Sequence, residues 1–432
     1  MAEHRSRPVS LRPPVADVTG LSAAGIDPVL RRIYAARGVS CAEELDYGLR
    51  GLLPVSSLAG IDAAVALLRE HADRRIVIIG DFDADGATST ALVMRCLREF
   101  GIADVGYLVP NRFRFGYGLT PEIVKVAAER KPDLLVTVDN GVSSIDGVAE
   151  AHRLGMKVLI TDHHLPGKVL PDADANVNPN LAGSTFASPN LAGVGVAFYL
   201  MAALGRALED AGQCGAARVP ARYLDLVALG TVADVVRLDH NNRILVEQGL
   251  ARIRAGRGVP GITALFAQAK RSVVRAVSTD LGFVAGPRLN AAGRLEDMSV
   301  GIECLLTDDA STAGRYAAML DEINRTRKDI EAKMRDEAFA YIDAMDARNL
   351  PPCVCLYDEQ WHQGVVGLIA ARVRERVDRP VVAFAREEAG LLKGSARSIP
   401  GVHVRDLLEA VATMEPGLIK RFGGHAMAAG LS

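Results

Sequence analysis

The sequence lacks several features that mark whole classes of protein. Its six cysteines form no Cys-x-x-Cys pair and no cysteine–histidine cluster with zinc spacing, so neither a disulfide scaffold nor a structural zinc site is expected. There is no run of 18 apolar residues, and the Arg- and Pro-rich N-terminus has no apolar stretch of the kind found in secretion signals. These absences predict a globular, cytoplasmic protein with reduced thiols and no membrane partner.

The sequence also lacks an excess of charge of either sign. Its 50 basic and 52 acidic residues leave a net charge of −2, whereas proteins that bind nucleic acid usually present a basic surface. Any contact with DNA must therefore come from a local basic groove, which acidic residues gathered around metal ions could hide in the total. The length of 432 residues predicts two or three domains at about 150 residues each.

Strands and helices alternate along the first half of the chain. After a segment of short helices at 27–74, the patterns of apolar residues predict strands at 76–79, 105–109, 134–138 and 157–160. Helices are predicted between them at 87–100, 120–129 and 144–154. Such alternation is typical of an α/β fold in which helices cover both faces of a parallel sheet.

A long charged segment separates this region from a second, smaller one. Leu320, Ile323 and Ile330 have roughly helical spacing, so we expect one long helix to connect two domains. Further strands at 354–357, 381–385 and 392–397, with a helix at 365–377, predict a smaller α/β domain. The predicted division is an N-terminal helical segment at 1–74, a main domain at 75–307, a linker helix at 308–350 and a small domain at 351–432.

Three carboxylates alternate in the segment 80–86, directly after the first predicted strand. At a period of two, Asp81, Asp83 and Asp85 could all turn to one side of an extended segment. Packing three like charges together is unfavourable unless cations neutralise them, and hard divalent cations prefer oxygen ligands. The alternatives are a solvated Asp-rich turn and a calcium-binding loop, but Leu92 occupies the position where that loop needs a glutamate.

Other acidic residues and histidines follow later predicted strands. Asp139 precedes an Asn-Gly pair, His163 and His164 follow Asp162, and Asp234 ends an apolar stretch. Each has a simpler interpretation, namely a plain turn, a surface histidine pair and a helix-end residue facing water. However, three strands deliver Asp or His to the same edge of one sheet, and this combination favours Mn²⁺ or Mg²⁺ in a two-metal site.

These segments together resemble a known family. The motifs DFDADG, VDNG, TDHH and GTVAD, in this order, are similar to those of the DHH phosphoesterases, and the Gly-Gly-His element at 423–425 resembles the associated DHHA1 domain. Within the superfamily, the chain is most similar to the RecJ family of single-strand-specific 5′-exonucleases over residues 27–432. Supporting stretches lie at 110–113, 116–119, 286–294 and 393–398.

The resemblance implies a parallel-sheet DHH domain joined by a long helix to a smaller α/β DHHA1 domain. It also implies a metal-dependent exonuclease that hydrolyses single-stranded DNA from 5′ to 3′ in DNA repair and recombination. Two Mn²⁺ or Mg²⁺ ions would be held by Asp81, Asp83, Asp85, Asp139, His163 and Asp234. His164 would face the scissile phosphate, and Asp162 would orient a histidine.

The resemblance extends to substrate and partners. A loop carrying Arg288, Asn290 and Arg294 would contact the DNA backbone, together with Ser395, Arg397, Gly424 and His425 from the small domain. Arg112 and Tyr117 could line the strand's channel, although a solvated basic loop and a tyrosine packed between two glycines are equally compatible with the sequence. A single-strand-binding protein and a helicase are the expected protein partners of a monomer.

The sequence leaves two other functions open. Similar motifs occur in relatives that cleave short oligonucleotides, cyclic dinucleotides or pyrophosphate, and in inactive relatives that serve as nucleic-acid-binding scaffolds. RecJ proteins usually continue past Gly-Gly-His into an oligonucleotide-binding barrel, which we do not expect here because the sequence stops at Ser432. The complete set of acidic residues favours an active enzyme, and the long segment after Asp234 favours the RecJ type.

Overall fold

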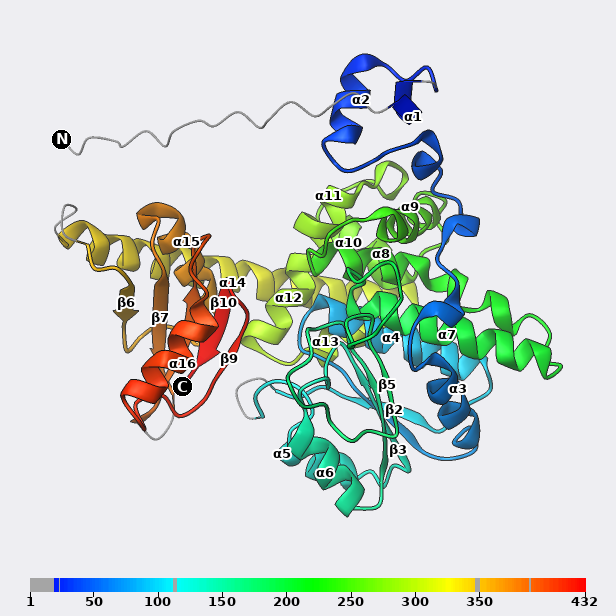
Figure 1. Cartoon of the computed structure of the whole chain (residues 1–432), viewed down its shortest axis with the longest axis horizontal. Helices are drawn as coiled ribbons and strands as arrows, with labels where there is room; N and C mark the ends of the chain where they lie inside the picture. The colour runs from blue at the N-terminus through cyan, green and yellow to red at the C-terminus, as the bar shows by residue number, and fades with distance from the viewer. Residues whose placement is uncertain (1–18, 23, 112–114, 346–349, 388–389) are drawn as a thin grey trace.

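A computed structural model describes residues 19–22, 24–111, 115–345, 350–387 and 390–432 of the chain. The structure contains two β-sheets, each packed against its own helices, and one long helix runs from the first sheet's domain to the second (Figure 1). Arg112, one of the residues expected to contact DNA, lies outside the described residues.

The first sheet has five parallel strands in the order β2-β1-β3-β4-β5. Four of them match the predicted strands within one residue at each end. The fifth was not predicted, because three residues are too few to establish a periodic pattern. The strands are β1 (Ile76–Ile79), β2 (Val105–Leu108), β3 (Leu134–Val138), β4 (Lys157–Thr161) and β5 (Ala175–Val177).

Helices cover both faces of this sheet, as the alternation of elements predicted. Ile76 and Ile78 point into the larger hydrophobic core, and Val77 and Ile79 point into the opposite one. The larger core is closed by helices α3 (Ile61–Glu70), α4 (Ala84–Glu99) and α7 (Gly193–Asp210). The opposite face is covered by α5 (Pro121–Ala128) and α6 (Ile145–Arg153).

The helix after β1 begins three residues earlier than the sequence analysis predicted. Asp83 is its N-cap, because the Asp83 side chain accepts hydrogen bonds from the amides of Asp85 (2.9 Å) and Gly86 (3.0 Å). The segment 81–85 is therefore not extended, and Asp85 lies in the first helical turn. An acidic N-cap followed by an acidic first turn favours helix formation here, because both charges lie near the positive end of the helix dipole.

A block of helices that the sequence analysis left unassigned lies between β5 and the long helix. The stretch 286–294, expected to be a loop, is helical, with Pro287 in the first turn, where proline is tolerated. A π-helical turn at Leu281–Ala285 leads into it. The helices are α8 (Leu224–Ala233), α9 (His240–Arg254), α10 (Pro260–Gln268), α11 (Ser278–Asp280), α12 (Gly286–Leu295) and α13 (Ser299–Leu306), while α1 (Thr19–Ser22) and α2 (Pro28–Ala35) lie before the first sheet.

The second sheet has the order β6-β7-β8-β10-β9, in which β6 and β7 are parallel and the other neighbours antiparallel. Helix α15 (Val366–Val377) packs against one face of it and α16 (Val404–Met414) against the other. Helix α16 and the β9–β10 hairpin were not predicted. The strands are β6 (Val354–Tyr357), β7 (Val381–Arg386), β8 (Leu392–Arg397), β9 (Phe422–Gly424) and β10 (Ala428–Leu431).

Helix α14 (Ala310–Ala344) connects the two sheets and confirms the predicted long helix. It runs 35 residues, from the helical block to the second sheet (Figure 1). Ala317 and Leu320 are buried in the first core, and Met334 and Ala338 are buried in the second. The helix is therefore a packed part of both domains rather than an exposed linker.

No single helix in the described part of the chain is long and apolar enough to cross a bilayer. One bent pair of segments, Leu49–Ser57 and Ile61–Glu70, passes the same test of length and composition. The second segment of this pair is α3, and Ile61, Ala64 and Leu68 of that helix are buried in the first core.

Asp174, just before β5, gives the first sheet a pH-dependent contribution to stability. Its carboxylate accepts from Lys157 Nζ (2.7 Å), from the amide of Val158 (2.8 Å) and from His152 Nε2 (2.8 Å). Burial raises the pKa of this carboxyl, but these hydrogen bonds outweigh it, so the pKa lies below its usual value. The native state therefore favours the ionised form.

We expect Asp174→Asn to lower the free energy of unfolding by about 1 kcal/mol at pH 7. Because the folded-state pKa is lowered, this contribution is present above the unfolded-state pKa of about 3.9 and is lost as the pH falls through the folded-state value. Urea unfolding of both proteins between pH 7 and pH 3 would test this. A stability difference that stays constant across that range would contradict the assignment.

Candidate metal and catalytic site

The predicted acidic residues meet at one edge of the first sheet, beyond the carboxyl ends of its strands. From β1 the chain goes to β2 on one side, and β3 lies on the other, so the direction of winding changes between β1 and β3. Open α/β sheets bind ligands at such a switch point. Asp81 follows β1, Asp139 follows β3 and His163 follows β4, so three neighbouring strands place one candidate ligand each at this position.

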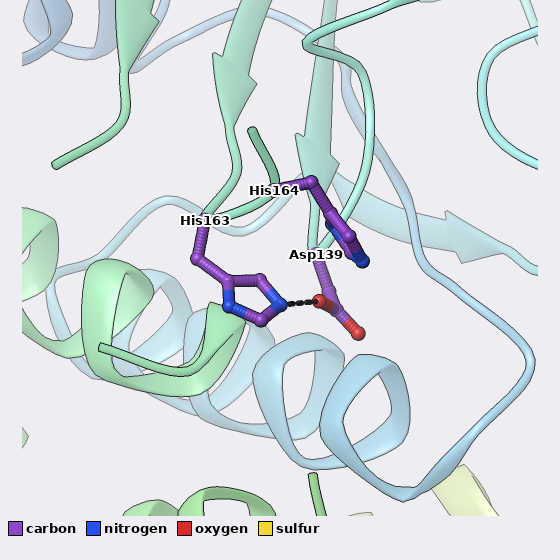
Figure 2. A group of neighbouring side chains, drawn as sticks. All are labelled: Asp139, His163 and His164. Atoms are coloured by element: carbon purple, nitrogen blue, oxygen red, sulfur yellow. Dashed lines mark ion pairs between the residues drawn. The ribbon is translucent and has the colours of Figure 1, made fainter. Parts of the chain in front are cut away.

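His163 lies at the centre of the cluster. Its Nε2 atom is 3.1 Å from Asp139 Oδ1, 3.7 Å from Asp234 Oδ2 and 3.9 Å from Asp85 Oδ2. Figure 2 shows the His163 ring directed at the Asp139 carboxylate, with the His164 ring beside it. Three overlapping groups have ligand atoms within 4.8 Å of one another: Asp139, His163 and His164; Asp85, His163 and Asp234; and Asp81, Asp83 and Asp139.

Asp139 has an unusual backbone conformation. Its φ of 63° is in the left-handed region, which residues other than glycine seldom adopt and which is often found at functional sites. The neighbouring Asn140 is buried, and its Nδ2 donates to the carbonyls of Ile79 (3.1 Å) and Val138 (2.9 Å) at the ends of β1 and β3. Asn140 therefore holds the two strand ends together and directs Asp139 into the site.

Asp162 orients the histidine pair. Its Oδ1 accepts from the amides of His163 (2.7 Å) and His164 (3.0 Å) and from His164 Nδ1 (2.7 Å). Its Oδ2 accepts from the amide of Val142 (2.8 Å). A single buried carboxylate thus determines both the backbone and the ring orientation of His164, which is the role that the resemblance implied for it.

Asp85 is the most enclosed acid of the cluster. It is 1% exposed, and its oxygens accept from the amides of Gly193 (2.6 Å) and Val194 (2.9 Å), the first two residues of α7. A carboxylate in this position is stabilised by the N-terminal end of the helix. Asp85 therefore ties α4 to α7 and faces His163 from within the core.

The crowding of carboxylates disfavours their charged forms. Burial, followed by the charges of Asp234 and Asp83, raises the pKa of Asp85 well above its usual value. Burial and the neighbouring acids likewise raise the pKa of Asp139. Burial and Asp83 raise the pKa of Asp234 to about 6. Divalent cations would remove this repulsion, so the site is poised to bind them.

The two histidines differ in charge. Burial, and then the charge of His164, lowers the pKa of His163 to about 4, so this ring is neutral at pH 7 and available as a metal ligand. Burial also lowers the pKa of His164, but the hydrogen bond and charge of Asp162 outweigh this effect and raise it to about 9. His164 therefore carries a positive charge at neutral pH.

The residues of the cluster fit a divalent metal centre. Asp139 Oδ1 and His163 Nε2 are both buried, and neither makes a hydrogen bond within the described ranges. The two atoms lie 3.1 Å apart, and buried polar atoms without hydrogen bonds are unfavourable, so a metal ion bound to both would supply the missing interaction. Several carboxylates with one imidazole form a ligand set that suits Mn²⁺ or Mg²⁺.

Comparison with known proteins identifies the family. Residues 75–231 match the DHH family, N-terminal domain, and residues 350–432 match the DHHA1 domain. The single-stranded-DNA-specific exonuclease RecJ of Dickeya dadantii is 56% identical over 412 residues, which are 94% of this chain and 72% of that protein. The chain belongs to the RecJ family. RecJ of Escherichia coli is 52% identical, over 98% of this chain and 75% of its own length.

A solved RecJ structure supports the same assignment. RecJ from Thermus thermophilus in complex with Mn²⁺ superimposes with a TM-score of 0.82 at 34% identity. The match covers 97% of this chain and 58% of that one. The same RecJ is also known in complex with Mg²⁺. These matches confirm the expected architecture, in which a parallel-sheet DHH domain is followed by a smaller DHHA1 domain.

Several of the residues expected to bind DNA in this RecJ-family chain meet in one pocket between the domains. The pocket has a volume of about 150 Å³ and is bordered by Arg294 of α12, Ser395 and Arg397 of β8, and the start of α15. Arg397 Nη1 donates to Ser395 Oγ (2.9 Å), and Arg294 Nη1 donates to the carbonyl of Gly364 (3.3 Å). Two guanidinium groups therefore lie at a pocket wide enough for a small anion.

The β9–β10 hairpin brings another expected residue to His164. The rings of His425 and His164 are stacked with centroids 6.2 Å apart and planes 9° apart. Gly424 has a φ of 144°, and a Cβ there would lie 2.4 Å from the carbonyl oxygen of Ala428. Tyr117, half-exposed on the other side, has its hydroxyl 3.2 Å from His164 Nδ1 and donates to the carbonyl of Asp139 (3.2 Å).

Two residues expected to bind DNA from the RecJ resemblance lie elsewhere. Arg288 forms an ion pair with Asp321 of α14 (Nη2–Oδ1 2.7 Å) and also donates to the carbonyl of Val284. Asn290 Oδ1 accepts from the amide of Ala84 (2.8 Å) at the start of α4. Neither residue borders the pocket that contains Arg294, and the DNA contacts expected for them stay a prediction.

Sequence reasoning missed several residues that shape the site. Asn178 and Asn180 donate to the carbonyls of His164 (2.9 Å) and His163 (2.6 Å). Both follow β5 at the same sheet edge as the other motifs, so recognition of that short strand would have indicated them. Lys393 also borders the interdomain pocket, but the stretch 393–398 was cited only for its resemblance to RecJ and Lys393 was not predicted to bind DNA. Gly193 was missed because its importance depends on a distant neighbour.

Gly193 lies in close contact with Asp139. A Cβ at Gly193 would lie 2.6 Å from Asp139 Cβ and 2.7 Å from Asp139 Oδ1. We therefore expect Gly193→Ala to displace this carboxylate and lower metal-dependent nuclease activity by about 100-fold, as misplacement by roughly 1 Å commonly does. Activity assays and circular dichroism would be compared with Gly314→Ala on α14, where a Cβ meets nothing within 4 Å. Normal activity in Gly193→Ala would contradict the prediction.

Proposed function

We propose that this chain hydrolyses the phosphodiester bonds of single-stranded DNA from the 5′ end, using two bound divalent metal ions. The observation that carries the proposal is a cluster of five aspartates and two histidines, His163 and His164, at the switch point of the first sheet. The RecJ relatives are named as single-stranded-DNA-specific exonucleases, and the Thermus structures contain Mn²⁺ or Mg²⁺. Either ion suits oxygen-rich ligands.

The proposed ligands are Asp81, Asp83, Asp85, Asp139, His163 and Asp234. Bound ions would activate water as a nucleophile and neutralise charge on the phosphate. His164 carries a proton at neutral pH and would donate a hydrogen bond to a non-bridging phosphate oxygen. Asp162 holds the His164 ring in the orientation required for that contact.

The pocket between the domains is the proposed site for a DNA phosphate. Burial, and then the charge of Arg374, lowers the pKa of Arg397, so an anion would stabilise this guanidinium. Arg294 and Ser395 would share the same phosphate, and Tyr117 and His425 would border the strand on either side of His164. Contacts of this kind read the backbone rather than the bases, so we expect little dependence on sequence.

The polarity can be tested with strands labelled at either end. We expect the wild-type chain with Mn²⁺ to release labelled mononucleotide first from a 5′-labelled single strand, and Asp139→Asn to release none. Earlier release from a 3′-labelled strand would overturn the proposed polarity. Intact long strands combined with cleaved dinucleotides would instead favour a phosphodiesterase acting on short substrates, and metal binding with no hydrolysis would favour a scaffold.

We also propose the domain division stated above, with a main domain at 75–307, a linker helix at 308–350 and a small domain at 351–432. Helix α14 and the two separate cores support it.

The site is assembled from one chain, which supports action as a monomer. A helicase would supply unwound strands and a single-strand-binding protein would cover them, so both are proposed partners in the cytoplasm, where DNA is repaired. Gel filtration with each partner would test this.

A further inference from the structure

The first turn of α4 is held by hydrogen bonds from its own N-cap residue and from a second helix. The first four amides of a helix have no partner within the helix and need acceptors from elsewhere. Asp83 accepts from the amides of Asp85 and Gly86 through its side chain and from Ala87 through its carbonyl. The remaining amide, that of Ala84, donates to Asn290 Oδ1 on α12 (2.8 Å).

Helix α12 also rests directly on the loop before α4. Gly293 lies one turn after Asn290, and a Cβ there would lie 1.7 Å from the carbonyl oxygen of Phe82. Phe82 and Ala84 alternate with the three acids of this segment. The two contacts of α12 are therefore interleaved with Asp81, Asp83 and Asp85, and they fix the backbone from which these side chains extend.

The other end of α12 packs against the small domain. A Cβ at Gly364 would lie 2.0 Å from the carbonyl oxygen of Arg294, and Arg294 Nη1 donates back to the carbonyl of Gly364. One helix thus contacts the acidic segment at its middle and the interdomain pocket at its end. A shift of α12 would change the acidic segment and the pocket together.

We propose that Asn290 is a positioning residue for the metal centre, which acts through its side-chain carbonyl on the first turn of α4 rather than through a contact with DNA. The inference rests on the proposed metal-dependent function. The hydrogen bond joins residues 206 positions apart, and it supplies the acceptor for an amide that the Asp83 side chain does not reach. Without it, Ala84, which lies between Asp83 and Asp85, would lose its hydrogen bond to the helix that also borders the interdomain pocket.

Two substitutions separate this role from a contact with DNA. Asn290→Ala removes the acceptor. Asn290→Asp keeps an oxygen that can accept from the Ala84 amide, and the positive end of the α4 dipole stabilises its negative charge. The aspartate side chain lacks the N–H donors that a phosphate contact would need. A positioning role therefore predicts rescue by aspartate, whereas a phosphate contact predicts that aspartate is the worse variant because its charge repels DNA.

The measurement is Mn²⁺ binding to the full chain without DNA, by isothermal titration calorimetry, together with anisotropy of labelled single-stranded DNA in the presence of EDTA. We expect Asn290→Ala to weaken Mn²⁺ binding by about tenfold, as loss of residues that support metal ligands commonly does. Asn290→Asp should bind Mn²⁺ within about threefold of the wild type or more tightly, and neither variant should change DNA affinity beyond about twofold.

The control is Asn324→Ala, which removes another buried asparagine whose Oδ1 accepts from Arg327 (2.8 Å) on α14, and it should leave Mn²⁺ affinity unchanged. Unchanged Mn²⁺ affinity in Asn290→Ala with weakened DNA binding would overturn the proposal. If Asn290→Ala does not fold, the Asn290→Asp variant still tests the proposal. Weakened Mn²⁺ binding in that variant would contradict the positioning role, which predicts rescue by aspartate. Wild-type chain that binds Mn²⁺ but digests no DNA would refute the proposed function and leave the positioning role intact.

Discussion

Replacing Asp139 with asparagine is expected to lower exonuclease activity by roughly a thousandfold or more, because a carboxylate proposed to bind the metal ions is lost. Asparagine keeps the size of the side chain and tolerates the left-handed backbone at this position, so the fold should persist. The thermal shift that Mn²⁺ produces in the wild type should shrink in the variant, because binding energy contributes to stability only where the ions bind.

Without metal, the same substitution should stabilise the protein. Burial and neighbouring acids raise the pKa of Asp139, so its ionised form destabilises the native state at any pH above its unfolded-state pKa of about 3.9. Asparagine has no charge to bury, so the free energy of unfolding should increase. In EDTA at pH 7, each kcal/mol of added stability should raise the melting temperature by about 2 °C. Calorimetry would test for a higher melting temperature of the variant in EDTA and for a smaller increase on addition of Mn²⁺. A variant that is destabilised in EDTA, or that retains activity, would contradict the assignment of Asp139.

Replacing His164 with alanine should lower activity by about 100- to 1000-fold and leave Mn²⁺ affinity within about threefold, since removal of one preorganised donor commonly has this effect. The ring is held by Asp162 and charged at neutral pH, and it lies beside the cluster rather than at its centre. The backbone amides of Val142, His163 and residue 164 continue to satisfy the buried Asp162 carboxylate, which limits the cost in stability.

His152→Ala is the matched control for His164→Ala. His152 is a histidine on α6 that pairs with Asp174, away from the cluster. Single-turnover digestion with saturating Mn²⁺, together with calorimetric Mn²⁺ titration, separates loss of chemistry from loss of metal. If His164→Ala loses Mn²⁺ binding as severely as Asp139→Asn, His164 is a ligand rather than the residue that faces the phosphate.

The sequence predicted the strands and the sheet edge well for a physical reason. The runs 76–79 and 134–138 match β1 and β3 at both ends, because each is bounded on both sides by charged residues or glycine that end the pattern. Parallel strands present their carboxyl ends at one edge, so a residue that follows a strand is placed there without knowledge of the tertiary contacts. This placement brought Asp81, Asp139 and His163 together correctly.

Local patterns could not predict the roles that depend on distant partners. An acidic N-cap followed by an acidic first turn has the same spacing as an extended acidic loop, so α4 was expected to begin too late. Arg288 and Asn290 were expected to contact DNA only because the stretch 286–294 resembles RecJ. Within the chain they form hydrogen bonds with residues 33 and 206 positions away, and no periodicity reports contacts at that range.

Helix α14 makes the two domains one cooperative unit. At 1.5 Å per residue it is about 50 Å long, and between Leu320 in one core and Met334 in the other it contains neither glycine nor proline. Melting either sheet would leave half of a helix without its packing, so heating should produce a single calorimetric transition. A cavity at the buried Trp361, in the domain that contributes none of the proposed metal ligands, is then expected to lower the melting temperature of both domains together.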